Sequence, residues 1–150
     1  MIAGHVLHPG SASAQGLRLT APLSFWGGTN EQGMVIDPHH PQHGTVLAGR
    51  VVLLPGSRGS SSSSSVLAEQ VRTGNAPAAL LLAEGDAILT LGALAAAELY
   101  DVHVPVLALE QDAFAAVPVG TDLTVTPSGH IHWDSRYAGD RGTNPPPVRE

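Results

Sequence analysis

The chain has 150 residues, no cysteine and a formal net charge of −6 at neutral pH. This length fits one domain with a substantial core, and the lack of cysteine excludes disulfides, thiol nucleophiles and any iron–sulfur or thiolate-zinc site built by this chain alone. The seven basic residues are scattered, which argues against nucleic-acid binding, and the low charged fraction of 13% predicts a tightly packed domain or one covered by a partner.

The first third of the chain has the pattern of short strands separated by turns. Residues 2–8 and 17–20 are expected to be strands, with a turn over the small, polar residues 11–16. Residues 34–36 and 45–54 predict further strands. Phe25 and Trp26 precede the double glycine Gly27-Gly28 in a loop, where both aromatic side chains are expected to be exposed.

The middle of the chain alternates strand and helix. Residues 50–54 predict a strand, 66–72 a helix ended by Gly74, 78–82 a strand buried on both faces, 87–100 a helix capped by Asp86, and 104–107 a strand. This order implies a parallel α/β layer. Residues 111–116 predict a helical turn, and residues 122–126 and 130–133 a final hairpin. The fold class is therefore α/β with a β-barrel-like part, over a domain of residues 1–133 and a polar, proline-rich tail of residues 134–150.

The sequence shows neither a targeting segment nor a membrane span. No charged segment followed by an apolar run opens the chain, and the apolar stretch of residues 87–99 is too short to cross a bilayer. We therefore expect a cytoplasmic protein.

The most informative segment is the loop of residues 55–65, in which Pro55-Gly56 ends a strand and six serines lead into a helix. A serine run is typical of a flexible linker. Here, however, it lies between a buried strand and an amphipathic helix, which predicts an ordered loop. The first N–H groups of a helix lack intrahelical partners and favour negative charge, so this arrangement predicts a site for a carboxylate or phosphate.

The histidines allow a different interpretation, a divalent-metal site. His39, His40 and His43 lie close together in the sequence, and His130 and His132 share one face of a predicted strand. No carboxylate stands at the spacing of a helix-borne zinc motif, and exposed loop histidines are usually unligated. Glu84 and Asp86 could be paired carboxylates, but Asp86 fits a helix cap better.

Five motifs in order resemble a known family. Residues 22–28, 35–41, 54–60, 75–79 and 88–92 together resemble the small subunit, or swivelling domain, of the aconitase X dehydratases. The resemblance implies a swivelling β/β/α fold, a large partner subunit with an iron or iron–sulfur centre, and an active site between the subunits. It assigns Ser60 in Gly59-Ser60-Ser61 as the base that removes the substrate proton.

The resemblance also indicates substrates and further site residues. Members dehydrate small hydroxy acids, either cis-3-hydroxy-L-proline to a pyrroline carboxylate or mevalonate 5-phosphate. The bacterial style of the motif and the absence of a lysine-rich loop favour cis-3-hydroxy-L-proline. Arg58, Gly59, Ser61, Gly27 and Gly28 are the expected substrate-binding residues, and this chain alone is expected to bind no cofactor.

Two departures from the family pattern, and one other class of function, stay open. Relatives commonly carry Cys or Thr at Ser61 and Gly later in the loop, and Asp-Pro where this chain has Asn30-Glu31. The first departure bears on substrate choice and the second on a turn. The alternative of another class is a non-catalytic anion-binding or regulatory module whose serine loop binds a ligand without proton transfer.

Overall fold

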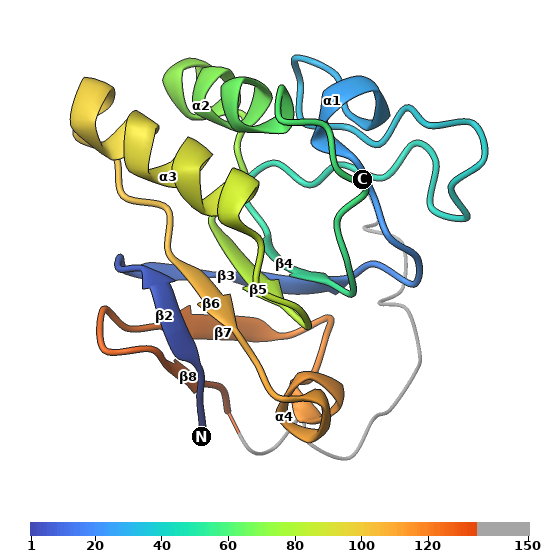
Figure 1. The fold of residues 1–150 in the computed structure, drawn as a ribbon. Helices are drawn as coiled ribbons and strands as arrows, with labels where there is room; N and C mark the ends of the chain where they lie inside the picture. Colours follow the sequence, from blue (N-terminus) through green and yellow to red (C-terminus); the bar gives the residue numbers. More distant parts are fainter. Residues whose placement is uncertain (135–150) are drawn as a thin grey trace, which may run out of the picture.

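The computed structural model describes residues 1–134, so nearly all of the predicted tail lies outside the described residues. The strands are β1 (Ile2–Ala3), β2 (His5–His8), β3 (Ala12–Arg18), β4 (Val51–Leu54), β5 (Ala79–Leu82), β6 (Val106–Ala108), β7 (Asp122–Val125) and β8 (His130–His132). The helices are α1 (Phe25–Gly28), α2 (Ser63–Thr73), α3 (Ala87–Tyr100) and α4 (Gln111–Ala116). In Figure 1, α2 and α3 lie on one side of the parallel strands, and β7 and β8 lie on the other.

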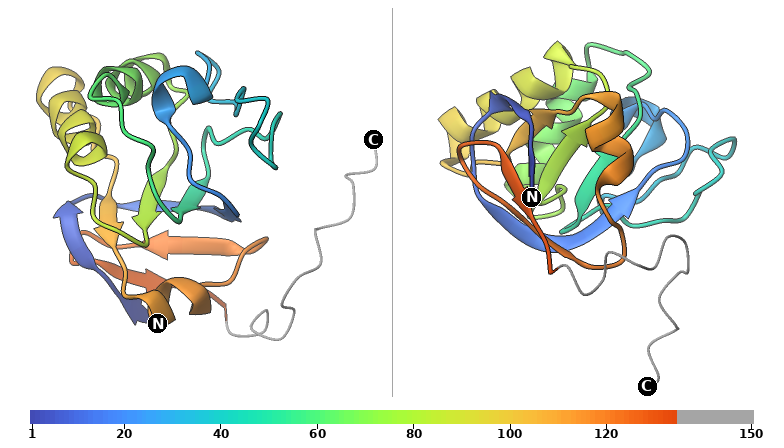
Figure 2. Two further views of the ribbon diagram at one scale, coloured as in Figure 1. Left: turned by 45° about the vertical axis from the view of Figure 1, so that its right-hand side comes forward. Right: turned by 90° about the horizontal axis from the view of Figure 1, so that it is seen from below.

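The strands form one curled sheet of mixed direction. Its order is β1-β8-β7-β3-β4-β5-β6-β2, in which β3, β4, β5 and β6 run parallel and the other pairs are antiparallel. The two strands at the ends of this order, β1 and β2, are consecutive in the chain, so the sheet curls back on itself (Figure 2). The predicted α/β class with a barrel-like part is confirmed.

The N-terminal strand predicted over residues 2–8 is divided at Gly4. β1 pairs with β8 and β2 pairs with β6, so the chain changes partner between them. The Gly4 N–H donates to the Gly129 carbonyl at 2.8 Å, and a Cβ on Gly4 would lie 2.6 Å from Leu109 Cδ2. Glycine permits this close approach, which the sequence pattern did not reveal.

The turn predicted over residues 11–16 was wrong, because residues 12–16 belong to β3. Their partners are distant in sequence: Ala12 pairs with Val125 of β7, and the later residue Gly16 pairs with Val51 of β4. Ala12 and Ala14 pack against the core that contains Ile131. Small and polar residues resemble a turn locally, but long-range pairing holds them extended.

The central strands are buried on both faces, as predicted for residues 78–82. Every residue of β4 and β5 is buried. Val52 and Leu54 of β4 face a core shared with Leu67 of α2 and Leu89 of α3. The alternate residues of β4 face a second core that includes residues of β7 and β8. The parallel strands are therefore the middle of three layers, with α2 and α3 on one side and β7 and β8 on the other.

Helix α2 ends and helix α3 begins at the caps predicted for them. Gly74, at φ 76°, closes α2 in the left-handed conformation. Asp86 caps α3 by accepting hydrogen bonds from the Ile88 and Leu89 N–H groups at 2.8 and 3.0 Å. Helix α2 begins at Ser63, three residues before the predicted start. Among the described residues, no helix is long and apolar enough to cross a membrane.

The segment between β3 and β4 is irregular but well anchored. Its short strand predicted at residues 34–36 is reduced to single bridges, Thr29 to Val35 and Met34 to Val46. The Phe25 ring is fully buried in the core under α2, so the expectation that it is exposed was wrong, whereas Trp26 is 57% exposed. The buried Phe25 anchors the turn that presents Trp26.

His8 makes the stability of the isolated domain depend on pH. Burial, with a smaller contribution from His103 stacked 5.7 Å away, lowers the pKa of His8, and its buried Nε2 atom has no hydrogen-bond partner among residues 1–134. His103 itself lies 3.3 Å from Asp101. In the unfolded chain His8 has a pKa of about 6.5. As the pH falls below this value, His8 therefore becomes protonated in the unfolded chain before it does in the folded chain. The stability contribution of neutral His8 is present above about pH 6.5 and is lost as the pH falls towards the folded pKa.

We expect the His8→Gln variant to lose less unfolding free energy between pH 7.5 and pH 5 than the original chain, in urea titrations at both pH values. His103→Gln is the control, because it removes only the smaller charge contribution. Equal losses in the original chain and the His8 variant would contradict the prediction.

Candidate functional site

The loop between β4 and α2 carries the predicted site and is held by backbone pairing. Ser57 forms a parallel bridge with Leu23, the Leu23 N–H donates to Gly56 O at 3.2 Å, and the Arg58 N–H donates to Leu23 O at 3.3 Å. These bonds join the loop to the segment that leads into α1. The loop and the turn at residues 25–28 therefore lie side by side at the carboxyl end of β4 (Figure 1).

Ser60 lies just before the first turn of α2. Its Oγ accepts a hydrogen bond from the Ser62 N–H at 3.2 Å, and its carbonyl accepts one from the Ser63 N–H at 3.0 Å. The residue is partly exposed. A hydroxyl oxygen at this position lies at the positive end of the helix dipole, next to a backbone donor. Both features stabilise negative charge on that oxygen.

The other predicted residues of the loop differ in what they contact. The Arg58 side chain is exposed, and its guanidinium has no hydrogen bond or ion pair within residues 1–134. Gly59 is exposed, and the Cβ of any larger residue there would lie 4.0 Å from Ile88 Cδ1 of α3. Ser61 is exposed and uses its carbonyl to accept from the N–H and the hydroxyl of Ser64, at 3.3 and 2.8 Å. Its hydroxyl has no partner in the part of the chain that is described.

The two glycines after Trp26 are not equivalent. Gly27, at φ 77°, is exposed, and a Cβ there would meet no atom within 4 Å. Gly28 is buried, its carbonyl accepts from the Ile36 N–H at 2.8 Å, and a Cβ would lie 3.0 Å from Leu23 Cδ1. Gly27 therefore leaves open space beside the loop, whereas Gly28 serves packing.

Ser63 joins this turn to α2, a role that sequence reasoning missed. Its side chain is fully buried, and its Oγ accepts a hydrogen bond from the Trp26 N–H at 3.1 Å. The two residues are 37 positions apart, so no local pattern signals the contact. A second link lies about two helical turns further on, where Gln70 Nε2 donates to Thr29 Oγ1 at 2.9 Å. The aromatic turn is thus fastened to the helix that begins after Ser60.

We expect Ser63→Ala to lower the unfolding free energy by about 1–2 kcal/mol, because it leaves the partly buried Trp26 N–H without an acceptor. Urea denaturation at constant pH measures the change. Ser65→Ala is the matched control, since Ser65 is exposed on the same helix. A Ser63 variant as stable as the Ser65 variant would show that this hydrogen bond contributes nothing.

The histidine clusters do not form a metal site in the described part of the chain, where no group of three or more His, Asp or Glu side chains could hold a metal ion. His40 is structural: its Nε2 lies 3.1 Å from Ala21 O, and its Nδ1 accepts from the Gln42 N–H at 3.0 Å. His130 bonds to Ser128 through Nδ1 at 2.9 Å.

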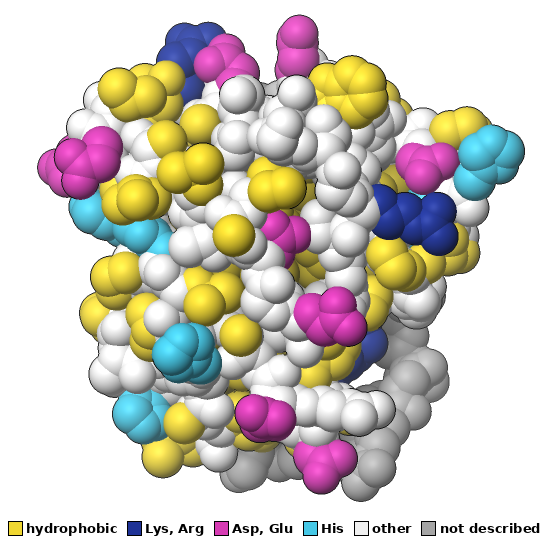
Figure 3. All heavy atoms as spheres, viewed as in Figure 1, with side chains coloured by type: hydrophobic (Ala, Val, Ile, Leu, Met, Phe, Trp, Pro, Cys, Tyr) yellow, Lys and Arg dark blue, Asp and Glu magenta, His cyan; other side chains and the backbone are white. Residues whose placement is uncertain are grey.

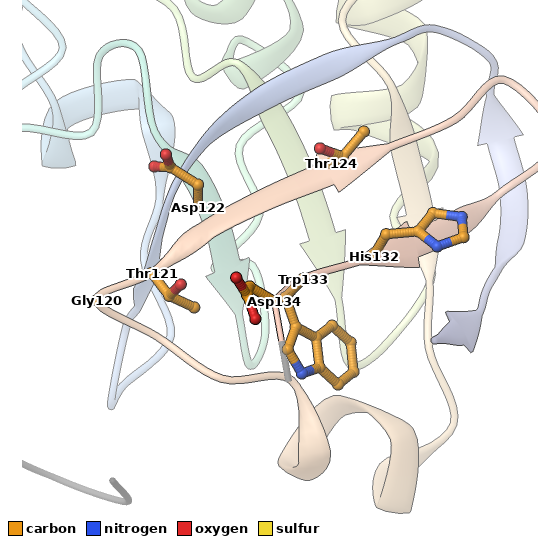
Figure 4. A pocket seen from close by; sticks show the side chains of 7 residues that line it. All are labelled: Gly120, Thr121, Asp122, Thr124, His132, Trp133 and Asp134. Atoms are coloured by element: carbon orange, nitrogen blue, oxygen red, sulfur yellow. The ribbon is translucent and has the colours of Figure 1, made fainter. Parts of the chain in front are cut away.

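Two surface hollows lie away from Ser60. One, of about 540 Å³, is lined by residues of β7, β8 and the loop before β7, with His132 and Trp133 at its edge (Figure 4). The other, of about 760 Å³, lies between residues 29–32 and the side of α2. Ser60, which is partly exposed, lines neither of these two hollows.

Comparisons with known proteins place this chain in a family. The family model described as the aconitase X swivel domain matches residues 1–133. The chain belongs to the aconitase X swivel domain family. The crystal structure of Thermococcus kodakaraensis aconitase X has the same fold, with a TM-score of 0.77 at 24% identity over 87% of this chain and 95% of that chain. The implied swivelling fold is therefore confirmed.

Named relatives of this swivel domain are dehydratases. A cis-3-hydroxy-L-proline dehydratase of Pseudomonas aeruginosa is 46% identical over 121 residues, which cover 79% of this chain and 21% of that protein. A phosphomevalonate dehydratase small subunit of Methanopyrus kandleri is 37% identical over 113 residues, covering 73% of this chain and 78% of that subunit. This chain spans about a fifth of the length of the cis-3-hydroxy-L-proline dehydratases that it matches, at 21% and 22%. The expected dehydratase family is confirmed by these names.

Proposed function

We propose that this chain is the swivelling component of an aconitase X hydro-lyase that dehydrates cis-3-hydroxy-L-proline, with Ser60 as the base. The observation that carries the proposal is the Ser60 hydroxyl at the start of α2, with the Ser62 N–H 3.2 Å from its oxygen. The 46% identity to the Pseudomonas aeruginosa cis-3-hydroxy-L-proline dehydratase supports this substrate over mevalonate 5-phosphate.

The proposed step is the loss of water from the hydroxy acid. Ser60 Oγ takes the proton from the carbon that bears the carboxylate, hydroxide departs from the neighbouring carbon, and a double bond forms between the two carbons. The enamine product then tautomerises to a pyrroline carboxylate. A serine hydroxyl is a weak acid, so it serves as a base only where N–H dipoles and positive charge stabilise its alkoxide.

The start of α2 would provide this stabilisation. The Ser62 N–H is already directed at the reacting oxygen, and the dipole of the 11-residue helix adds positive potential. Arg58, which has no ion-pair partner within residues 1–134, would bind the substrate carboxylate from the side of the loop. Gly59, Ser61 and Gly27 would border the substrate, since each is exposed. Gly28 would only support the turn.

The departing hydroxide needs a group that residues 1–134 do not provide. The chain has no cysteine, and its described residues form no metal-binding cluster. We therefore assign an iron or iron–sulfur centre, which would act as a Lewis acid on the leaving hydroxyl, to a large catalytic component. That component would also cover the exposed side of Ser60. The protein would act in the cytoplasm and would be inactive alone.

The test is to express this chain with the large aconitase X component of the same genome and to purify the assembly. Mass spectrometry then measures the loss of one water from cis-3-hydroxy-L-proline and, separately, from mevalonate 5-phosphate. We expect dehydration of the first substrate only by the assembly. Dehydration of the second alone would replace the proposed substrate. Carboxylate binding by the isolated chain, with no association and no turnover, would favour an anion-binding module instead.

A further inference from the structure

Helix α3 is almost entirely apolar, although one side of it is exposed. Of its 14 residues only Glu98 is charged. Its inner side packs through Leu89, Gly92, Ala93, Ala96 and Ala97, all of them buried. A helix that is apolar on all sides is usually covered on all sides. The outer side of α3 is therefore an unusual surface for a domain that stands alone.

The exposed apolar side chains follow the helical repeat. Leu91 is 56% exposed and Leu94 is 46% exposed, and Ala87 and Glu98 continue the same line at spacings of four, three and four residues. Figure 3 shows hydrophobic side chains gathered over α3 on the face that this view presents. We call the surface of Ala87, Leu91 and Leu94 the α3 face.

The first two turns of α3, which carry Ala87 and Leu91 of the α3 face, lie close to the Ser60 loop and the start of α2. A Cβ on Gly59 would lie 4.0 Å from Ile88 Cδ1, which is in the first turn of α3. One turn further on, Gly92 lies so close to Ser64 that a Cβ would be 2.7 Å from the Ser64 carbonyl oxygen. A partner protein that covers Ser60 therefore also contacts the first two turns of α3.

We propose that the large catalytic component docks on the α3 face through Leu91 and Leu94. This inference rests on the proposed function, which requires such a body over Ser60. The cis-3-hydroxy-L-proline dehydratases that the chain matches are about five times as long as the matched region, so they contain a body large enough to cover this face.

The charges around the α3 face predict which kinds of side chain the partner surface should carry. Beyond the apolar line, the far end of α3 carries Glu98 and then Asp101, whose side chain is 98% exposed, with the exposed Leu99 and Tyr100 between them. The chain as a whole has a net charge of −6. The docking surface of the large component is therefore apolar at its centre and basic where it meets the end of α3. A second copy of this chain presents the same acidic end, so it fits less well.

Glutamine at Leu91 and Leu94, singly and together, tests the docking face. Purified chain is titrated into the separately purified large component, and both binding and dehydratase activity are measured. We expect Leu91→Gln/Leu94→Gln to raise the concentration for half-maximal activity about tenfold or more, because each replacement removes apolar burial. Turnover at saturation should stay unchanged. Val119→Gln is the control, since Val119 is 42% exposed on another part of the surface.

The outcomes separate this inference from the proposed function. If the original chain neither binds nor activates the large component, the proposed function fails. If the original chain binds and the double variant binds equally well, only the docking face is wrong. A concentration-dependent dimer of the isolated chain that the double variant abolishes, with unchanged binding to the large component, would assign the face to a second copy and overturn the inference. Thermal unfolding of each variant checks that it is folded.

Discussion

Ser60→Ala should lower the turnover of the assembled dehydratase by about 10³-fold, the usual contribution of a positioned proton-transfer group. The substitution removes only the hydroxyl group. The backbone hydrogen bond from the Ser63 N–H to the Ser60 carbonyl, at 3.0 Å, is kept. Assembly with the large component and substrate binding should therefore be retained. Stopped assays of the purified assembly, with saturating cis-3-hydroxy-L-proline, measure the loss.

The neighbouring serine provides the matched control for Ser60. Ser62 is the N-cap of α2, is exposed, and makes no hydrogen bond through its side chain to the helix. Ser62→Ala should therefore keep turnover within about twofold, because surface changes of this kind have small effects. Ser60→Ala with the turnover of Ser62→Ala would refute the base assignment, and a loss of assembly would show that Ser60 acts in docking rather than in chemistry.

The alternating part of the chain was predictable because its signals are local. The capping carboxylate Asp86, the terminating Gly74 and the fully apolar run of β5 each fix an element through neighbours in sequence. The position of Ser60 beside a helix start follows from the same reasoning. Ser63 extends the helix further towards Ser60 than its low helix propensity suggests, since its buried hydroxyl has a tertiary partner in Trp26.

The features that were missed depend on contacts across the fold. Residues 12–15 of β3 are extended because they pair with β7, more than 100 residues later. Phe25 is buried because α2 covers it, although its neighbours Trp26 and Gly27 are exposed. The link between the aromatic turn and α2 likewise joins distant segments. None of these contacts leaves a pattern in the sequence around either partner, so only the folded chain shows how the turn and the serine loop meet.

Gly92→Ala should destabilise the domain by about 1–2 kcal/mol, although alanine normally stabilises a helix interior relative to glycine by about 0.5–1 kcal/mol. The added Cβ would lie 2.7 Å from the Ser64 carbonyl oxygen and 3.1 Å from Ser64 Cα. Both are backbone atoms of α2 and cannot rotate away, so the two helices must separate, and overpacking of this kind costs about 1–3 kcal/mol. Urea denaturation measures the change in unfolding free energy.

Gly56→Ala is the control for the Gly92 prediction, because a Cβ there would make an ordinary contact of 3.7 Å with Pro22 Cγ. Gly92→Ala should also reduce turnover in the assembly. Ser64 lies in the first turn of α2, so its displacement would also displace the Ser60 loop that leads into this turn. The control should change neither stability nor turnover by much. A Gly92 variant more stable than the original chain would show that helix propensity outweighs the contact with Ser64. In that case the start of α2 could shift with no loss of unfolding free energy. This result would contradict the expectation that α2 holds the Ser60 hydroxyl in a fixed position.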